Sequence, residues 1–112
     1  MIVTLANHFG LTAVGLYYTD IVSMVGANSV LIQGITISVA GTPAPTFLAQ
    51  GSVDKEIWVP ATTTAAKAFA TSVGGQGNET WGPFGWPYMR VEISQVAAGQ
   101  TVVAILANTF SK

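Results

Sequence analysis

The segment Tyr88-Met-Arg-Val-Glu-Ile-Ser94 decides the fold class, because polar or aromatic residues alternate along it with aliphatic ones. Successive side chains of an extended chain point to opposite faces. The two faces would carry Tyr88, Arg90 and Glu92 on one side, and Met89, Val91 and Ile93 on the other. The segment therefore predicts a β-strand with one buried face and one solvated face.

Two further strands are predicted on either side of this one. Residues 101–107 are almost continuously apolar, which is typical of a strand at the centre of a sheet. Along residues 33–39, Ile35, Ile37 and Val39 fall on one face, which predicts a half-buried strand. Prolines at 43 and 45 would end it, because proline cannot donate to a strand ladder.

The middle of the chain predicts a hairpin followed by irregular segments. We expect a strand at 46–51, a turn at 52–55 and a returning strand at 56–59. Residues 62–73 combine alanines, which favour helix, with threonines, which favour strand, and we predict a strand. Gly74-Gly-Gln-Gly77 predicts a turn or loop, and the glycines and prolines of 81–87 exclude regular structure.

This spacing of strands and turns predicts an all-β fold, a single antiparallel β-sandwich with jelly-roll-like topology. The sandwich domain is expected over residues 29–112. Residues 1–28 favour β structure without a clear alternation, so they are expected to form either edge strands or an N-terminal arm that reaches a neighbouring molecule.

The low charge of the chain points to association. Only 8% of the 112 residues are charged, whereas soluble domains carry about 25%. Half of the residues are hydrophobic. Such a composition leaves little charge to cover a monomer, so we expect the chain to form homo-oligomers.

Several classes of function are disfavoured. The net charge of −1 and four scattered cations provide no basic surface for nucleic acid. Polar residues and prolines interrupt the uncharged stretch 21–53, so no membrane span is expected. The N-terminus lacks the basic start of a secretory signal, and the absence of cysteine excludes disulfides and thiolate chemistry.

The residues that could carry chemistry form no convincing catalytic set. His8 is the only histidine and has no acid near it in sequence. Asp54 and Glu56 could pair as acid and base or bind calcium, but their place in a predicted turn favours a structural role. Asn78-Glu-Thr80 matches the glycosylation pattern, which arises often by chance. We therefore expect neither enzymatic activity, nor a cofactor, nor a metal.

Aromatic residues are the candidate contact residues. Four of them lie within eight residues, at Trp81, Phe84, Trp86 and Tyr88. They could plug the end of the sandwich, anchor a protein interface or stack on sugars. The N-terminal segment adds three more candidates for an interface: Phe9, Tyr17 and Tyr18.

The chain resembles small virion structural proteins of bacteriophages that have a β-sandwich fold. The resemblance covers residues 35–107 and rests on Ser52-Val-Asp54 followed by Trp58, on Pro87-Tyr-Met-Arg-Val91 and on Thr101-Val-Val-Ala-Ile105. Lys55 stands where the pattern has glycine, which argues against a turn with positive φ.

The resemblance implies a capsid decoration (cement) protein that oligomerises on the coat lattice, with a trimer as one arrangement. The alternative is a tail, collar or fibre module that could bind carbohydrate. The implied partners are the major capsid protein or other virion proteins, and the location is the virion, assembled in the host cytoplasm. The resemblance also implies that Arg90 lies near Trp58 and pairs with Asp54.

Overall fold

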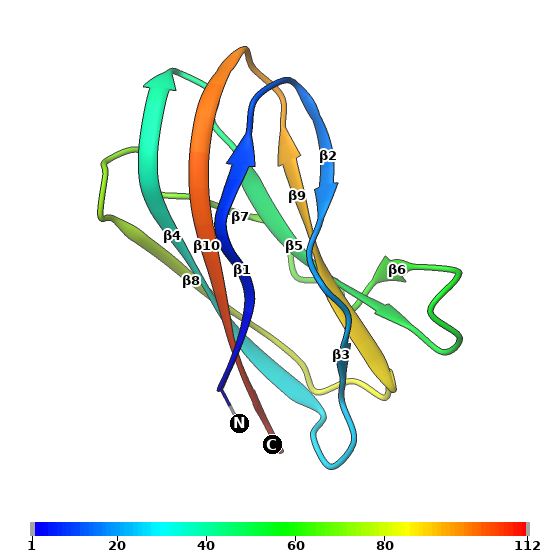
Figure 1. The fold of residues 1–112 in the computed structure, drawn as a ribbon. Coiled ribbons are helices and arrows are strands. Elements are labelled where there is room, and N and C mark those ends of the chain that lie inside the picture. The colour runs from blue at the N-terminus through cyan, green and yellow to red at the C-terminus, as the bar shows by residue number, and fades with distance from the viewer. Residues whose placement is uncertain (1, 112) are drawn as a thin grey trace.

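The computed structural model describes residues 2–111 and contains two antiparallel sheets packed as a sandwich (Figure 1). Its strands are β1 (Ile2–Leu11), β2 (Gly15–Tyr18), β3 (Val22–Ser23), β4 (Ser29–Gly41), β5 (Thr46–Ser52), β6 (Val59–Pro60), β7 (Lys67–Ala68), β8 (Gln76–Trp81), β9 (Tyr88–Gln95) and β10 (Gly99–Phe110). No helix occurs among these residues, and hence none that could cross a membrane. The predicted all-β sandwich is confirmed.

Apart from the two-residue strands β3, β6 and β7, consecutive strands alternate between the two sheets. The first sheet has the order β1-β10-β4-β8, and the second has the order β2-β9-β5-β6, with β3 beside β9 and β7 beside β5. In Figure 1 the chain accordingly crosses from β1 to β2 and from β4 to β5. This is the connectivity of a jelly roll.

The core lies between the sheets and follows the alternation of the strands. Met89, Val91 and Ile93 are fully buried, whereas the residues between them on β9 are half-exposed, as predicted. β10 pairs with both β1 and β4, which confirms that the apolar stretch 101–107 lies at the centre of a sheet.

The predicted inner face of β4 is wrong. Ile35 is half-exposed and Thr36 is fully buried, with its hydroxyl donating to the carbonyl of Ala70 at 2.7 Å. The register between β4 and β10 shifts at Val102 and Val103, so Val39 lies opposite the buried Thr101. Ile35 and Val39 therefore face opposite sides of the sheet, because a one-residue shift exchanges the two faces.

The expectations for the segments between β5 and β9 need correction as well. Of the residues between β5 and β8, only Val59–Pro60 and Lys67–Ala68 form strands that pair with β5, so the returning strand is short and residues 62–73 are mostly irregular. The expected glycine loop at 74–77 instead runs into β8, which pairs with β4 from Gln76 onward. Tertiary pairing thus overrides the local preference of these residues.

The N-terminal residues form edge strands. β1 pairs with β10, while β2 and β3 pair with β9. Leu5 and Leu11 belong to the hydrophobic core. Thr19 is also buried, and its hydroxyl accepts a hydrogen bond from the Val91 N–H at 3.0 Å. Residues 2–23 therefore pack as part of the sandwich.

A glycine on β4 gives a test of core packing. A Cβ at Gly34 would lie 2.7 Å from ring carbons of both Phe47 and Phe69, so Gly34→Ala should lower the free energy of unfolding by about 1–3 kcal/mol. The matched control is Gly10→Ala on β1, where a Cβ would meet no atom within 4 Å. Urea denaturation measures both, and equal midpoints would contradict the packing described here.

Candidate interaction surfaces

Arg90 is the centre of an aromatic cluster on the outer face of the β2-β9-β5-β6 sheet. Its guanidinium carbon lies 3.9 Å from the ring centroid of Tyr18 and 4.4 Å from that of Trp58. Tyr18 belongs to β2, and Trp58 belongs to the loop between β5 and β6. Because the cation contacts both rings, it joins an edge strand and a loop to β9.

A chain of hydrogen bonds holds Arg90 in this position. Its Nε donates to Gln50 Oε1 at 2.8 Å, and Gln50 Nε2 donates to Glu92 Oε2 at 3.0 Å. Gln50 lies opposite Arg90 in the register of β5 and β9. The side-chain amide therefore links the cation to a carboxylate and fixes the guanidinium against the rings.

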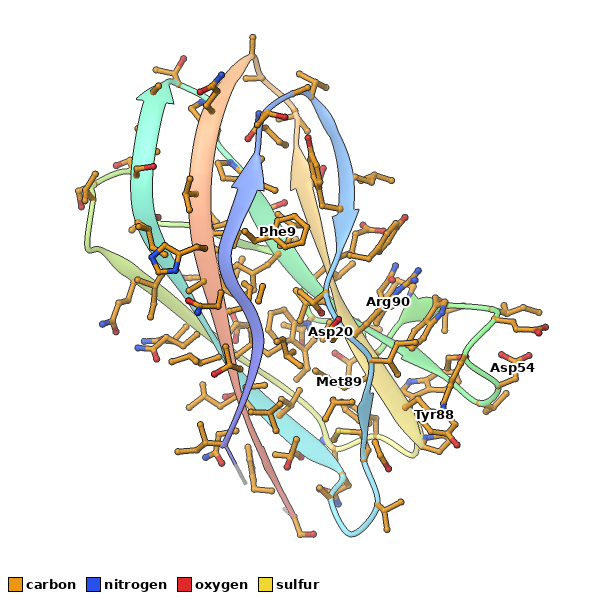
Figure 2. All side chains as sticks on the ribbon, viewed as in Figure 1. Phe9, Asp20, Asp54, Tyr88, Met89 and Arg90 are labelled. Atoms are coloured by element: carbon orange, nitrogen blue, oxygen red, sulfur yellow. The ribbon has the colours of Figure 1, made fainter. Side chains whose placement is uncertain are left out.

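The predicted pairing of Arg90 with Asp54 is wrong, although Trp58 does lie beside Arg90 as expected. Asp54 Oδ1 accepts hydrogen bonds from the backbone N–H groups of Glu56 at 2.9 Å and Ile57 at 3.1 Å, and from the Ser52 hydroxyl. Figure 2 shows Asp54 at the tip of the loop, apart from Arg90. These backbone bonds, followed by the bond from Ser52, lower the pKa of Asp54 below its ordinary value of 3.8.

The expectation at Lys55 is also corrected, because this residue adopts a φ of 68° although it is not glycine. Its N–H donates to the Ser52 hydroxyl at 2.9 Å, and its carbonyl accepts from the Trp58 indole at 3.2 Å. The Lys55 ammonium lies 4.6 Å from the centroid of the Tyr88 ring. Contacts on both sides of the backbone thus hold the left-handed conformation that glycine would adopt without cost.

The rings of segment 81–88 pack mainly inward. Trp81 is fully buried against Phe47, so a partner could not contact it without rearrangement. Phe84 and Trp86 are partly buried against the core, and the Trp86 indole donates to the Ala61 carbonyl at 3.0 Å. Tyr88 is half-exposed. These contacts match an end plug, and the role of the segment at an interface stays a prediction.

The N-terminal candidates divide in a similar way. Phe9 and Tyr17 pack edge to face, with ring centroids 5.9 Å apart, and both rings rest against the core. Tyr18 is 41% exposed and contacts Arg90. Of the three residues, Tyr18 thus offers the most surface to a partner.

The remaining residues considered for chemistry, His8 and Asn78, lie on different strands. His8 is exposed on β1, and its Nδ1 lies 2.9 Å from the Asn7 side-chain oxygen. Asn78 is part of β8. Within residues 2–111, no three histidine, aspartate or glutamate side chains gather as they would around a metal ion.

One surface was not predicted from the sequence, the outer face of the β1-β10-β4-β8 sheet. Strand registers place the following residues on it: Ile2, Thr4, Leu31, Gln33, Ile35, Ser38, Gln76, Asn78, Thr80, Val102, Ala104, Leu106 and Asn108. We call this set the uncharged face, because none of its members is ionisable. It contains a shallow hollow of about 240 Å³. The absence of charge from residues 29–41 and 99–110 is the sequence signal that could have revealed it.

Comparisons with known proteins bear on the fold. No protein-family model and no curated protein sequence matches the chain. Among solved structures, the chain is similar to the SPBc2 prophage-derived protein YomS, with a TM-score of 0.54. The similarity covers 96% of this chain and 92% of that one at 11% sequence identity. It shows that a prophage-derived protein shares this fold.

Removing the guanidinium should loosen the sheet and the loop together. Arg90→Ala is expected to lower the free energy of unfolding by about 1–3 kcal/mol, because two ring contacts and a hydrogen bond are lost. Arg90→Lys should recover part of the lost stability. Lys67→Ala removes a half-exposed cation of β7 and serves as the control. An unchanged midpoint for Arg90→Ala in chemical denaturation would mean that the cluster does not stabilise the fold.

The hydrogen bonds of Asp54 predict a pH dependence of its loop. Because its folded pKa lies below 3.8, the ionised carboxylate stabilises the loop above that value, and the stabilisation is lost as the pH falls through the folded pKa. The amide signal of Ile57 should therefore titrate with a midpoint below 3.8 in NMR spectra. Asp54→Asn should abolish this titration. A midpoint at or above 3.8 would contradict the assignment.

Proposed function

We propose that this chain is a structural protein of a bacteriophage virion, and specifically a capsid decoration protein that forms homo-oligomers on the coat lattice. Its partner on the virion is the major capsid protein. The role is one of binding, without catalysis or a cofactor. The chain would be assembled onto the virion in the host cytoplasm.

One observation carries the proposal: the four-stranded sheet of this sandwich turns a broad face without charge outward. Antiparallel sheets that face water normally carry polar and charged residues there. A protein that assembles with neighbours has less need of charge on its covered surfaces. A prophage-derived protein has a similar fold over nearly the full length of this chain, which also supports the proposal.

The end of the sandwich that carries residues 82–88 is our proposed contact with the coat. Phe84 and Trp86 are partly buried, and Tyr88 is half-exposed on the adjoining strand. Pro83 and Pro87 restrict the backbone that presents these rings, which lowers the conformational entropy lost on binding. Rigid aromatic anchors commonly supply much of the binding energy of an interface.

The first experiment asks whether the chain is part of the virion. Particles of the phage that encodes it are purified on a density gradient and analysed by mass spectrometry, and a labelled antibody locates the chain by electron microscopy. We expect it in the particles, on the head. Absence from the particles would contradict the proposal, and labelling of the tail would replace decoration with a tail, collar or fibre role.

The second experiment tests the coat contact. Purified chain is mixed with capsids that lack it, and co-sedimentation measures binding. Phe84→Ser should weaken binding about tenfold or more, because an aromatic anchor is removed. Val96→Ser is the matched control, since Val96 is 72% exposed and follows β9 at the opposite end of that strand. Equal binding by the two variants would show that residues 82–88 do not contact the coat.

A further inference from the structure

The uncharged face differs sharply from the outer face of the other sheet. Arg90 and Glu92 project outward from β9, with Gln50 beside them on β5. The uncharged face has uncharged polar residues and aliphatic ones instead, including Leu31, which is 38% exposed, and Ile2, which is 76% exposed. One protein thus presents one outer face with charges and one without.

The chemistry of this face selects its partner. A charged surface placed on it would lose hydration without gaining an opposite charge, which is unfavourable. Aliphatic groups and amides are matched best by a surface that also offers aliphatic groups and amides. A second copy of the same face has this composition by necessity, with Leu31 and Leu106 for apolar contact and Gln33 and Asn78 for hydrogen bonds.

The size of the face also suits a dimer. Its four strands have 10, 12, 13 and 6 residues. With strands about 4.8 Å apart and a rise of about 3.3 Å per residue, the whole outer side of the sheet covers about 650 Å² in projection, of which the uncharged face makes up about 410 Å². Stable interfaces bury about 600–1,000 Å² on each partner. Two copies that pack with the uncharged face at the centre and the rest of the sheet around it would therefore bury enough surface when packed as the sheets of a sandwich are packed.

The geometry of the sheet edge favours packing by faces over pairing by edges. β1 is an edge strand whose register with β10 shifts twice, between Thr4 and Ala6 and between Ala6 and Phe9. Within the second shift, His8 has a φ of 49°. Such irregularities disturb the straight row of backbone groups that another strand would need for pairing.

We infer that two copies of this chain associate through the uncharged face, related by a twofold axis. For the homo-oligomer, this inference rests on the proposed function. It adds the surface through which the copies associate, and it favours two copies over a trimer. The same patch on each copy forms the contact, so the assembly closes without exposing a further apolar surface. The rings of residues 82–88 remain available for the coat.

The test measures molecular mass by analytical ultracentrifugation at micromolar concentrations. Wild-type chain should sediment with twice the 11.6 kDa of one copy. Leu31→Glu with Leu106→Glu should raise the dissociation constant by at least about tenfold, because each carboxylate would be buried without a partner. Circular dichroism verifies that the variant is folded. Ile2→Glu, on the most exposed apolar position of the face, provides a second and milder variant.

The matched control is Leu16→Glu with Val53→Glu, which adds the same charge at positions 56% and 66% exposed outside the uncharged face. It should remain dimeric. A monomeric wild-type chain would overturn the inference, as would dissociation of the control while the variants on the face stay dimeric.

The dimer and the virion role can be refuted independently of each other. A wild-type monomer found on virion heads would refute this dimer and leave the decoration role intact. Conversely, the wild-type chain could be a dimer that the face variants dissociate, while the particles of the phage lack the chain. That result would support the dimer and refute the virion role.

Discussion

The close approach of Phe47 to a pair of glycines is the contact on which the two sheets depend. Gly34 on β4 and Gly77 on β8 lie opposite each other, and a Cβ at either would meet the ring of Phe47 within 4 Å. Phe69 and Trp81 complete the aromatic group, with ring centroids 4.9 and 6.0 Å from that of Phe47. Three large rings thus fit between the sheets because two backbone positions lack side chains.

This arrangement explains why the outward faces are free to differ. The large core side chains come from both sheets and include Phe47, Met89, Ile32 and Ile105. Since packing fixes the inner faces, the outer faces are constrained mainly by solvent and partners. One outer face holds the Arg90 cluster, which joins β2 and the 53–58 loop to the sheet. On the other, the strand registers place no aspartate, glutamate, lysine or arginine at the positions of the uncharged face, although its strands are among the longest in the chain.

The sequence predicted well those elements whose pattern was local. The alternation of β9 and the apolar run of β10 require no knowledge of their neighbours. The inner face of β4 could not be predicted in this way, because the register shift opposite Val102 and Val103 depends on β10 and leaves no mark in the alternation of residues 33–39. The strand predicted at residues 62–73 was wrong for the same reason, since only two of these residues pair with β5.

The candidate site could be predicted only in part, for a related reason. The position of Trp58 beside Arg90 was implied by the resemblance, but the choice of Gln50 as the hydrogen-bond partner depends on the register of β5 with β9. Asp54 is satisfied by the backbone of its own loop, as aspartate in turns often is. A local capping bond thus took precedence over the ion pair that the resemblance implied.

The placement of charge connects the composition to assembly. The described acids and bases outside the four-stranded sheet lie on β7, on β9, or in the segments at 20 and 54–56. Within that sheet, the described ionisable residues are His8 and Glu79. His8 lies in the irregular part of β1. Glu79 pairs with the buried Ile32, so the register does not place it on the uncharged face. Low overall charge alone would be consistent with a poorly soluble monomer. Apolar side chains such as Val25 and Val96 are also exposed elsewhere, but the uncharged face gathers apolar residues on four adjacent strands, so association there removes several of them from water together.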